Sequence, residues 1–444
     1  MYDIMIYWHY VLQFRGTEIS IDSANSGAEA IAMTKNTKYD IIFMDHLMPE
    51  MDGIETFHRI RDDSGSLRII MKIDRIGRYT AGAFGPRIGK CMDREFNSIT
   101  EDIKNTGTIN KDQLEYILKA CDEESAEYLF AAARSTAERY YGKAVYLRGL
   151  VEFTNYCKND CYYCGIRCSN QKAQRYRLTE EEILSCCDIG EKTGFRTFVL
   201  QGGEDPYFTD DRICRLVERI KKDHPSCAVT LSIGEKSRES YQRFFDAGAD
   251  RYLLRHETAD NEHYRKLHPD HMSPENRKRC LFDLKEIGFQ VGCGIMVGSP
   301  FQTIEHIYED IVFMQALKPH MIGIGPFIAH KDTPFGNRPD GSVKHTLRLL
   351  SVIRLLFPDV LLPATTALGT ADPMGREKGI LAGANVLMPN LSPADVRKKY
   401  LLYDGKICTG EEAAECSACL RRRIERIGYH VSENRGDHPG VAFK

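Results

Sequence analysis

Short apolar runs alternate with amphipathic segments through most of the chain, and this alternation is the feature that most constrains the fold. Each run ends in polar, glycine or proline residues. Eight strand–helix units over about 250 residues are typical of a (β/α)8 barrel of the TIM type, with an open doubly wound α/β sheet as the alternative. The expected strands are residues 145–153, 196–201, 228–233, 250–255, 291–297, 320–327, 360–366 and 384–389.

Composition places the chain among ordinary globular proteins. Of its 444 residues, 42% are hydrophobic and 28% are charged, which excludes wholesale disorder. The net charge of −3 gives no reason to expect nucleic acid or an anionic membrane as a partner. No apolar run reaches the roughly 18 residues that span a bilayer, and residues 1–3 do not begin a signal peptide. We therefore expect a cytoplasmic protein.

The cysteines are the unusual part of the composition. The chain has 15 of them, and in a reducing compartment they serve metal or redox sites more often than disulfides. Cys157, Cys161 and Cys164 follow the first expected strand with C-x3-C-x2-C spacing. Three thiolates on one loop can hold three corners of a 4Fe–4S cube and leave one iron open to a ligand. Most of the scattered cysteines are interpreted as small packing residues.

Cys168, four residues after this trio, leaves other interpretations open. With Cys168 as the fourth ligand, the loop is a zinc site or a closed electron-transfer cluster. The trio's spacing, however, is the signature of radical S-adenosylmethionine (SAM) enzymes. In these enzymes the open iron binds the amino and carboxylate groups of SAM, and an electron from the cluster cleaves SAM to a 5′-deoxyadenosyl radical. We expect Cys168 to be free, because a fourth thiolate would block SAM.

Residues at neighbouring strand ends support the SAM interpretation. The active site of a barrel lies at the carboxyl ends of its strands. Gly202, Gly203 and Glu204 follow the second expected strand, and Arg255 and Glu257 follow the fourth. Glycines let a backbone approach a ligand closely, and a guanidinium is suited to binding a carboxylate. We therefore expect these residues beside the cysteine loop.

A longer match points to one family. Residues 109–430 resemble the HydE family of FeFe-hydrogenase maturases, which are radical SAM enzymes with a barrel fold. The resemblance covers about three quarters of the chain, and long stretches in the same order are more specific than a single motif. The stretches that carry it are residues 151–155, 200–207, 229–235, 251–259, 323–328, 363–370 and 383–390.

The resemblance implies roles for matching residues. The ligands of the 4Fe–4S cluster would be Cys157, Cys161 and Cys164. The residues that hold SAM would be Tyr163 (its backbone beside the adenine), Gly202, Gly203, Glu204, Arg255, Glu257 and Arg277. The substrate cavity would be lined by Gln201, Thr230, Ser232, Thr365, Thr366 and Tyr403. An accessory 2Fe–2S cluster would be held by Cys408, Cys416 and Cys419.

The resemblance also implies a role in assembling the two-iron subcluster of FeFe-hydrogenase. The substrate would be a cysteine-bound iron carbonyl cyanide, supplied by a radical SAM tyrosine lyase, and the adenosyl radical would attack its sulfur. The product would pass to a scaffold GTPase, and a low-potential electron donor would reduce the cluster. The nearest alternatives are 3-methylornithine synthase and, more distantly, biotin synthase.

The first 71 residues carry a separate pattern. An apolar run at residues 39–44 ends at Asp45, and a turn and a helical pattern follow to about residue 61. This pattern, with the stretch 23–30 before it, resembles the CheY-like receiver domain of response regulators, in which Asp45 would be the phosphoacceptor. The acidic pair that holds Mg²⁺ and the later Ser/Thr and Lys strand ends are missing. We therefore interpret Asp45 as inactive; the alternative is a signalling protein governed by it.

Together the two resemblances divide the chain into five expected segments. They are a truncated receiver-like fragment at 1–71, a linker at 72–108, a helical lead-in at 109–142, the barrel at 143–400, and a C-terminal segment with the second cysteine trio at 401–444.

Overall fold

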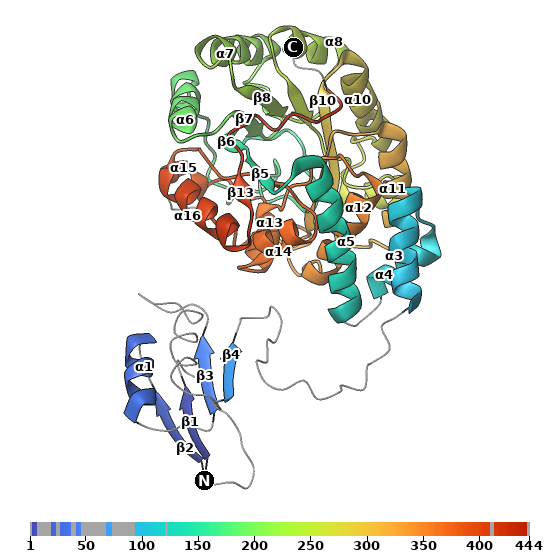
Figure 1. Ribbon diagram of the computed structural model, residues 1–444. Coiled ribbons are helices and arrows are strands. Elements are labelled where there is room, and N and C mark those ends of the chain that lie inside the picture. The colour runs from blue at the N-terminus through green and yellow to red at the C-terminus, as the bar shows by residue number, and fades with distance from the viewer. Residues whose placement is uncertain are drawn as a thin grey trace. The chain divides into compact units, whose positions relative to one another are not determined.

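The computed structural model divides the chain into two compact units, Met1–Lys90 and Cys91–Lys444 (Figure 1). Each unit is described by itself below. The residues that the structure describes are 2–6, 19–23, 27–36, 41–45, 68–72, 94–119, 123–408 and 413–441.

The first unit contains a four-stranded parallel sheet in the order β2-β1-β3-β4. Its described elements are β1 (Tyr2–Ile6), β2 (Ile19–Ser23), α1 (Gly27–Asn36), β3 (Ile41–Asp45) and β4 (Arg68–Lys72). This order is the one found in flavodoxin-like α/β folds, to which receivers belong. Asp45 ends β3, as expected. The turn and helix expected at residues 46–61 lie outside the described residues.

The second unit begins with helices, and one of them differs from the expectation. Helix α3 (Arg94–Thr106) lies inside the segment 72–108, where a linker was predicted. Phe96, Ile99 and Ile103 recur at helical spacing and are buried, so they form an apolar face that the linker prediction overlooked. The next two helices, α4 (Lys111–Lys119) and α5 (Glu123–Tyr141), lie within the predicted helical lead-in at 109–142.

Six parallel strands form the main sheet of this unit, in the order β11-β10-β9-β8-β7-β6. They are β6 (Gly149–Thr154), β7 (Thr197–Gly202), β8 (Ala228–Ser232), β9 (Arg251–Leu253), β10 (Gln290–Val297) and β11 (Met321–Pro326). The helices between and after them are α6 (Glu180–Lys192), α7 (Asp210–Asp223), α8 (Arg238–Asp246), α9 (Asn261–Leu267), α10 (Pro274–Ile287), α11 (Ile304–Leu317) and α12 (Val343–Leu356). Figure 1 shows helices around the outside of these strands.

The last two predicted strands close this sheet into a barrel. Single parallel bridges join Met321 to Leu361, Pro363 to Val386, and Leu150 back to Asn390. Backbone hydrogen bonds support the closure at both edges, at 3.0 Å from Ile322 N to Leu361 O and 2.8 Å from Leu150 N to Pro389 O. The predicted barrel is therefore confirmed over its whole circumference.

The remaining described elements are a small sheet and four helices from the C-terminal part of the chain. A small sheet has the order β12-β5-β13. Its strands are β5 (Ala144–Leu147), β12 (Val386–Leu387) and β13 (His430–Val431). The remaining helices are α13 (Thr366–Ala371), α14 (Gly375–Leu381), α15 (Ala394–Arg397) and α16 (Ala413–Arg426). No helix in the described ranges is long and apolar enough to cross a membrane.

Candidate active site

The cysteine loop leaves the carboxyl end of β6 and is fixed there by buried polar contacts. Thr154 Oγ1 donates to Asp205 Oδ2 at 2.7 Å, and Asn155 Nδ2 donates to Lys399 O at 2.7 Å. A tight turn follows, in which Cys164 N donates to Cys161 O at 3.2 Å. These anchors tie the loop both to the next strand end and to the chain after the last barrel strand.

The three thiols of this loop are sheltered from solvent. Burial raises the pKa of all three thiols, to about 12 for Cys164, with Cys157 and Glu257 adding to the rise there. In the metal-free protein they therefore carry protons, which iron binding must displace. Cys161 Sγ lies 3.8 Å from Met272 Sδ, next to the start of α10. Cys168, expected to be free, is exposed.

Within the described residues, no three His, Cys, Asp or Glu side chains are grouped to hold a single metal ion. A 4Fe–4S cube has a different requirement, because each of its three thiolates binds its own iron.

The glycines after β7 let two loops meet. A Cβ atom added to Gly203 would lie 2.2 Å from Tyr156 O and 2.7 Å from the Cys157 Cβ. Only a residue without a side chain permits this approach. The next residue, Glu204, forms an ion pair with Lys158 at 3.2 Å and accepts from Glu235 N at 3.1 Å. The end of β7 therefore packs directly against the cysteine loop, as predicted.

Arg255 and Glu257 form the polar end of β9. Their ion pair spans 3.2 Å from Nη2 to Oε2 without hydrogen-bond geometry. Arg255 Nε and Nη2 and Glu257 Oε2 are buried and have no hydrogen-bond partner. Glu257 also has φ of 64°, a left-handed conformation that non-glycine residues adopt mainly where the surroundings impose it. Two donor atoms and one acceptor are thus left for a bound group with a carboxylate and a hydroxyl.

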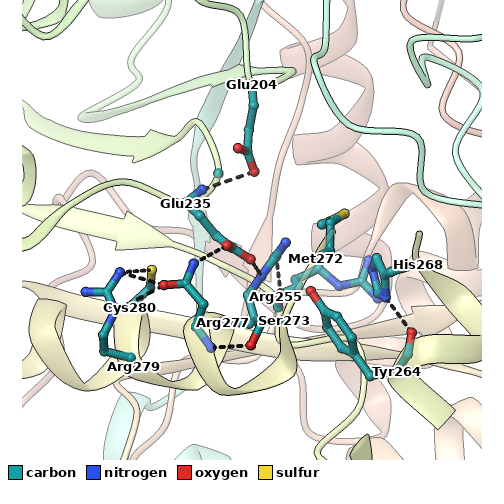
Figure 2. Close-up of polar contacts among 12 residues, drawn as sticks. Glu204, Glu235, Arg255, Tyr264, His268, Met272, Ser273, Arg277, Arg279 and Cys280 are labelled. Atoms are coloured by element: carbon teal, nitrogen blue, oxygen red, sulfur yellow. Dashed lines mark hydrogen bonds and ion pairs between the residues drawn. The ribbon is translucent and has the colours of Figure 1, made fainter. Parts of the chain in front are cut away.

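Arg277 supports this strand end from α10. Its guanidinium pairs with Glu235 and donates from Nη1 to Arg255 O at 2.9 Å. Figure 2 shows this chain of contacts from Glu204 through Glu235 and Arg277 to Arg255. These contacts hold Arg277 against Arg255, and its predicted role in holding SAM stays a prediction.

Tyr163 joins the cysteine loop to α9. Its hydroxyl and His268 Nε2 are 3.1 Å apart, and the ring of His268 stacks on Tyr264 with centroids 4.0 Å apart. Burial lowers the pKa of His268 to about 3, so this imidazole is neutral. Tyr163 is thereby held rigidly, with its backbone one residue before Cys164.

The predicted substrate residues lie at several depths of the barrel. Gln201 and Ser232 are half-buried at the ends of β7 and β8, whereas Thr230 is buried deeper, beside Arg251. Its hydroxyl has no hydrogen-bond partner. Thr365 caps α13 by accepting from Leu368 N, and Thr366 is the first residue of that helix. Burial raises the pKa of Tyr403, and Glu152 adds to the rise, while Thr370, Arg376 and Arg255 oppose it.

Sequence reasoning missed a buried ion pair in the barrel. Glu152, in the middle of β6, lies 2.5 Å from Lys406 Nζ, and both side chains are nearly inaccessible. Asn390 Nδ2 donates to the second oxygen of Glu152 at 2.7 Å. Lys406 also donates to Tyr400 O at 2.9 Å. An acidic residue inside an apolar strand run was the signal that could have identified Glu152.

The second cysteine trio is only partly described. Cys408 is half-buried with φ of 62°, and both terminal nitrogens of Arg376 lie 3.6 Å from its sulfur. Cys419 is exposed on α16. The side chain of Cys416 lies outside the described residues. The accessory cluster therefore stays a prediction.

Comparison with known proteins identifies the family. Residues 151–314 match the model of the radical SAM superfamily, and residues 3–74 match that of the response regulator receiver domain. The [FeFe] hydrogenase maturase subunit HydE of Thermotoga maritima is 46% identical over 74% of this chain and 94% of that protein. The chain is a radical SAM enzyme of the HydE family.

More distant relatives share the fold. The 3-methylornithine synthase of Methanosarcina barkeri is 31% identical over 75% of this chain and 93% of that protein. The crystal structure of methylornithine synthase (PylB) aligns with a TM-score of 0.68 at 29% identity, over 75% of this chain and 97% of that one. The HydE-family relative is thus more similar in sequence, at nearly the same coverage, than the 3-methylornithine synthase.

A radical SAM enzyme has a 4Fe–4S cluster and SAM as cofactors, and the residues present fit both. Three sheltered thiols share one loop, and the unpaired donors of Arg255 complement a carboxylate. Gly203 and Glu204 bring backbone and carboxylate groups to the same loop, where they suit an amino group.

Proposed function

We propose that the protein cleaves SAM reductively at the carboxyl end of its barrel during assembly of the two-iron subcluster of FeFe-hydrogenase. The observation that carries the proposal is that two nitrogens of the Arg255 guanidinium, Nε and Nη2, are buried and lack a hydrogen-bond partner at the strand end beside the cysteine loop. Membership of the HydE family supports the maturation role, together with other maturation factors.

In this proposal each group around SAM has a stated task. Cys157, Cys161 and Cys164 hold the cluster, which when bound supplies the electron for cleavage. Arg255 binds the SAM carboxylate through Nε and Nη2, and Glu257 accepts from a ribose hydroxyl. The other predicted contacts are the Gly202–Gly203 backbone and Glu204 at the amino group and the Tyr163 backbone at the adenine. Holding SAM in one geometry directs the radical toward the barrel interior.

The substrate in this proposal is a cysteine-bound iron carbonyl cyanide. A cysteine moiety needs hydrogen-bond partners for its ammonium and carboxylate. The predicted cavity residues offer them, with hydroxyl or amide groups on Gln201, Thr230, Ser232, Thr365, Thr366 and Tyr403. Residues 400–406 hydrogen-bond to loops around the barrel mouth, at 2.9 Å from Gly165 N to Leu402 O and 3.1 Å from Asp404 N to Ala329 O. This covering limits the access of water to a reactive radical.

The first test is SAM cleavage. Reconstituted protein with SAM and dithionite is expected to release 5′-deoxyadenosine, and Cys161→Ala is expected to abolish the release because one iron loses its ligand. SAM is also expected to change the EPR spectrum of the reduced cluster. Unaltered cleavage by Cys161→Ala would refute the ligand assignment, and an unaltered spectrum would indicate that Cys168 occupies the open iron.

The second test separates the two candidate products. In vitro maturation of apo-hydrogenase, with this protein replacing the HydE component, is expected to restore hydrogen evolution. The competing function is 3-methylornithine synthesis, which the 31% identical relative makes worth testing. Release of 3-methylornithine without hydrogenase activation would replace the maturation proposal and leave the SAM chemistry intact.

A further inference from the structure

Two exposed tyrosines and three basic residues form a patch on the rim of the barrel beside the cysteine loop. We call it the rim patch, and it consists of Tyr156, Lys158, Arg177, Tyr207 and Arg212. Tyr156 and Tyr207 are 36% and 45% exposed, which is unusual for side chains of this size. The SAM chemistry described above assigns these side chains no task.

Stacking holds the aromatic rings of the rim patch in place. The guanidinium of Arg177 lies 3.8 Å from the ring centroid of Tyr156 and 4.8 Å from that of Tyr207. Arg212 covers Tyr207 at 3.9 Å. Tyr207 also meets Phe208 edge to face, with centroids 5.2 Å apart. Rings fixed in this way lose little conformational entropy when a partner covers them, and tyrosine and arginine are enriched at interface hot spots.

The ion pairs of the rim patch present their positive ends outward. The side chain of Lys158 is 56% exposed, while that of its partner Glu204 is 10% exposed. For Arg177 and Asp205 the values are 34% and 1%. The carboxylates point into the protein and the cations face solvent, so a partner meets a cationic surface although the whole chain has a net charge of −3. Such a surface complements an acidic partner.

The position of the rim patch indicates what the partner delivers. Tyr156 directly precedes Cys157, and Lys158 directly follows it. Helix α7 follows the carboxyl end of β7, and Arg212 is in the first turn of this helix. A protein bound to the rim patch therefore contacts the residues on both sides of the predicted cluster ligand Cys157, on the solvent-exposed side of the cysteine loop. Reductive SAM cleavage needs one electron from outside for each cluster reduction.

We propose that the rim patch docks an acidic one-electron carrier protein that reduces the cluster. In this step the carrier loses one electron and the cluster gains it, and no proton or group is transferred. The proposal rests on the proposed SAM chemistry. The positive charges of the rim patch set the rate at which the carrier associates, and the tyrosines of the rim patch supply the contact area that the carrier buries.

The test compares two charge reversals on one helix in the reconstituted holoenzyme. Arg212→Glu alters the rim patch, and a glutamate in a first helical turn is compatible with the helix dipole. Lys222→Glu, the matched control, makes the same change about 15 Å away at the other end of α7, where Lys222 is exposed. Tyr207→Ser is a second rim variant that leaves the charge unchanged.

The probe is a purified bacterial flavodoxin in its fully reduced state. Stopped-flow absorbance follows cluster reduction, and calorimetry measures flavodoxin binding without turnover. At low ionic strength we expect Arg212→Glu to slow reduction and weaken binding by about threefold to tenfold, with a flatter salt dependence than the unmodified protein. Tyr207→Ser is expected to weaken binding at every salt concentration, and Lys222→Glu to change neither quantity.

Dithionite separates this proposal from the proposed function, because a small reductant needs no docking surface. Dithionite-driven release of 5′-deoxyadenosine is expected to be the same in all three variants. Unchanged flavodoxin binding in both rim variants would overturn the docking proposal, as would an equal effect of Lys222→Glu. Loss of dithionite-driven cleavage in the rim variants would show that the patch supports the cluster instead. Failure of the unmodified protein to cleave SAM with dithionite would overturn the proposed function.

Discussion

His256, which stands between Arg255 and Glu257 in the chain, and Asp310, which lies on helix α11, are both completely buried. Gly294 N donates to His256 Nδ1 at 3.3 Å, so the imidazole proton is on Nε2, which faces Asp310 Oδ1 at 3.4 Å. The same oxygen accepts from Ala259 N at 2.5 Å. One buried carboxylate thus holds the chain on both sides of the left-handed Glu257.

At this scale we predict that Asp310→Ala destabilises the protein by about 1–3 kcal/mol, because it leaves the buried Ala259 N–H unpaired and removes the carboxylate that faces His256 Nε2. SAM affinity is expected to fall as the Arg255–Glu257 geometry relaxes. Urea unfolding and titration of the SAM-induced EPR change measure the two effects. Asp310→Asn keeps an acceptor for Ala259 and serves as the milder control. Unchanged SAM affinity in both variants would contradict the positioning role.

Gly203 supports a second prediction about a single residue. A methyl group at this position meets the backbone of Tyr156, so Gly203→Ala is expected to displace the cysteine loop and lower the iron and sulfide content after reconstitution. Gly323→Ala is the matched control, because its added Cβ would meet nothing closer than 3.7 Å. An unchanged iron and sulfide content in Gly203→Ala would contradict this prediction, because it would show that the loop after β7 and the cysteine loop can move apart without loss of the cluster.

At the scale of elements, the C-terminal tail closes the amino-terminal end of the barrel. Arg251, at the start of β9, donates to Asp437 Oδ1 at 2.6 Å and to Arg435 O at 3.0 Å. Gln290, at the start of β10, also donates to Asp437 at 2.7 Å. Burial disfavours the charge of Asp437, but Arg251, Gln290 and Arg435 together lower its pKa to about 2.

This closure predicts a pH dependence with a definite sign. The pKa of Asp437 is lower in the folded state than the unfolded value of about 3.9, so its stabilisation is present above pH 4 and is lost as the pH falls toward 2. Asp437→Asn is expected to lower stability at pH 7 and to flatten the fall between pH 4 and 2. Urea unfolding of the apoprotein across this range measures both. If the free energy of unfolding fell equally with pH in the unmodified protein and in Asp437→Asn, the proposed link between Asp437 protonation and stability would be refuted.

At the scale of the whole molecule, two units share one chain. The second unit, Cys91–Lys444, contains the barrel, every predicted SAM and cluster residue, and α3. The first unit has the strand order of a receiver and places Asp45 at a strand end. Its phosphoacceptor activity stays untested, and the acidic Mg²⁺ pair of a receiver is absent from the sequence before residue 20.

We predict that a variant starting at Cys91 retains SAM cleavage within about twofold, because its core is complete. Acetyl phosphate with Mg²⁺ is expected to leave no stable label on Asp45 of the full chain. Release of 5′-deoxyadenosine and intact-protein mass measure the two results. A labelled Asp45 whose phosphorylation changes the cleavage rate would favour the signalling alternative.

The predictions succeeded where short-range spacing carries the information. Alternating apolar runs specify the barrel strands, and the trio's spacing puts three thiols on one loop. The helix at 94–106 was missed because its apolar spacing lay among glycine-rich and charged residues that read as a linker. The contacts of Arg277 could not be predicted, because no local pattern places Glu235 and the Arg255 carbonyl against its guanidinium.

The sequence by itself determined the order of strands, the cluster loop and the family to which the chain belongs. The tertiary structure alone decided which distant residues meet. Glu152 and Lys406 form an ion pair although they are 254 positions apart. His256, after β9, faces Asp310 on α11. The guanidinium of Arg177 lies over the rings of both Tyr156 and Tyr207. The physical reason is that local spacing fixes what one strand or loop presents, whereas barrel closure brings together charges and rings whose pairing no local pattern encodes.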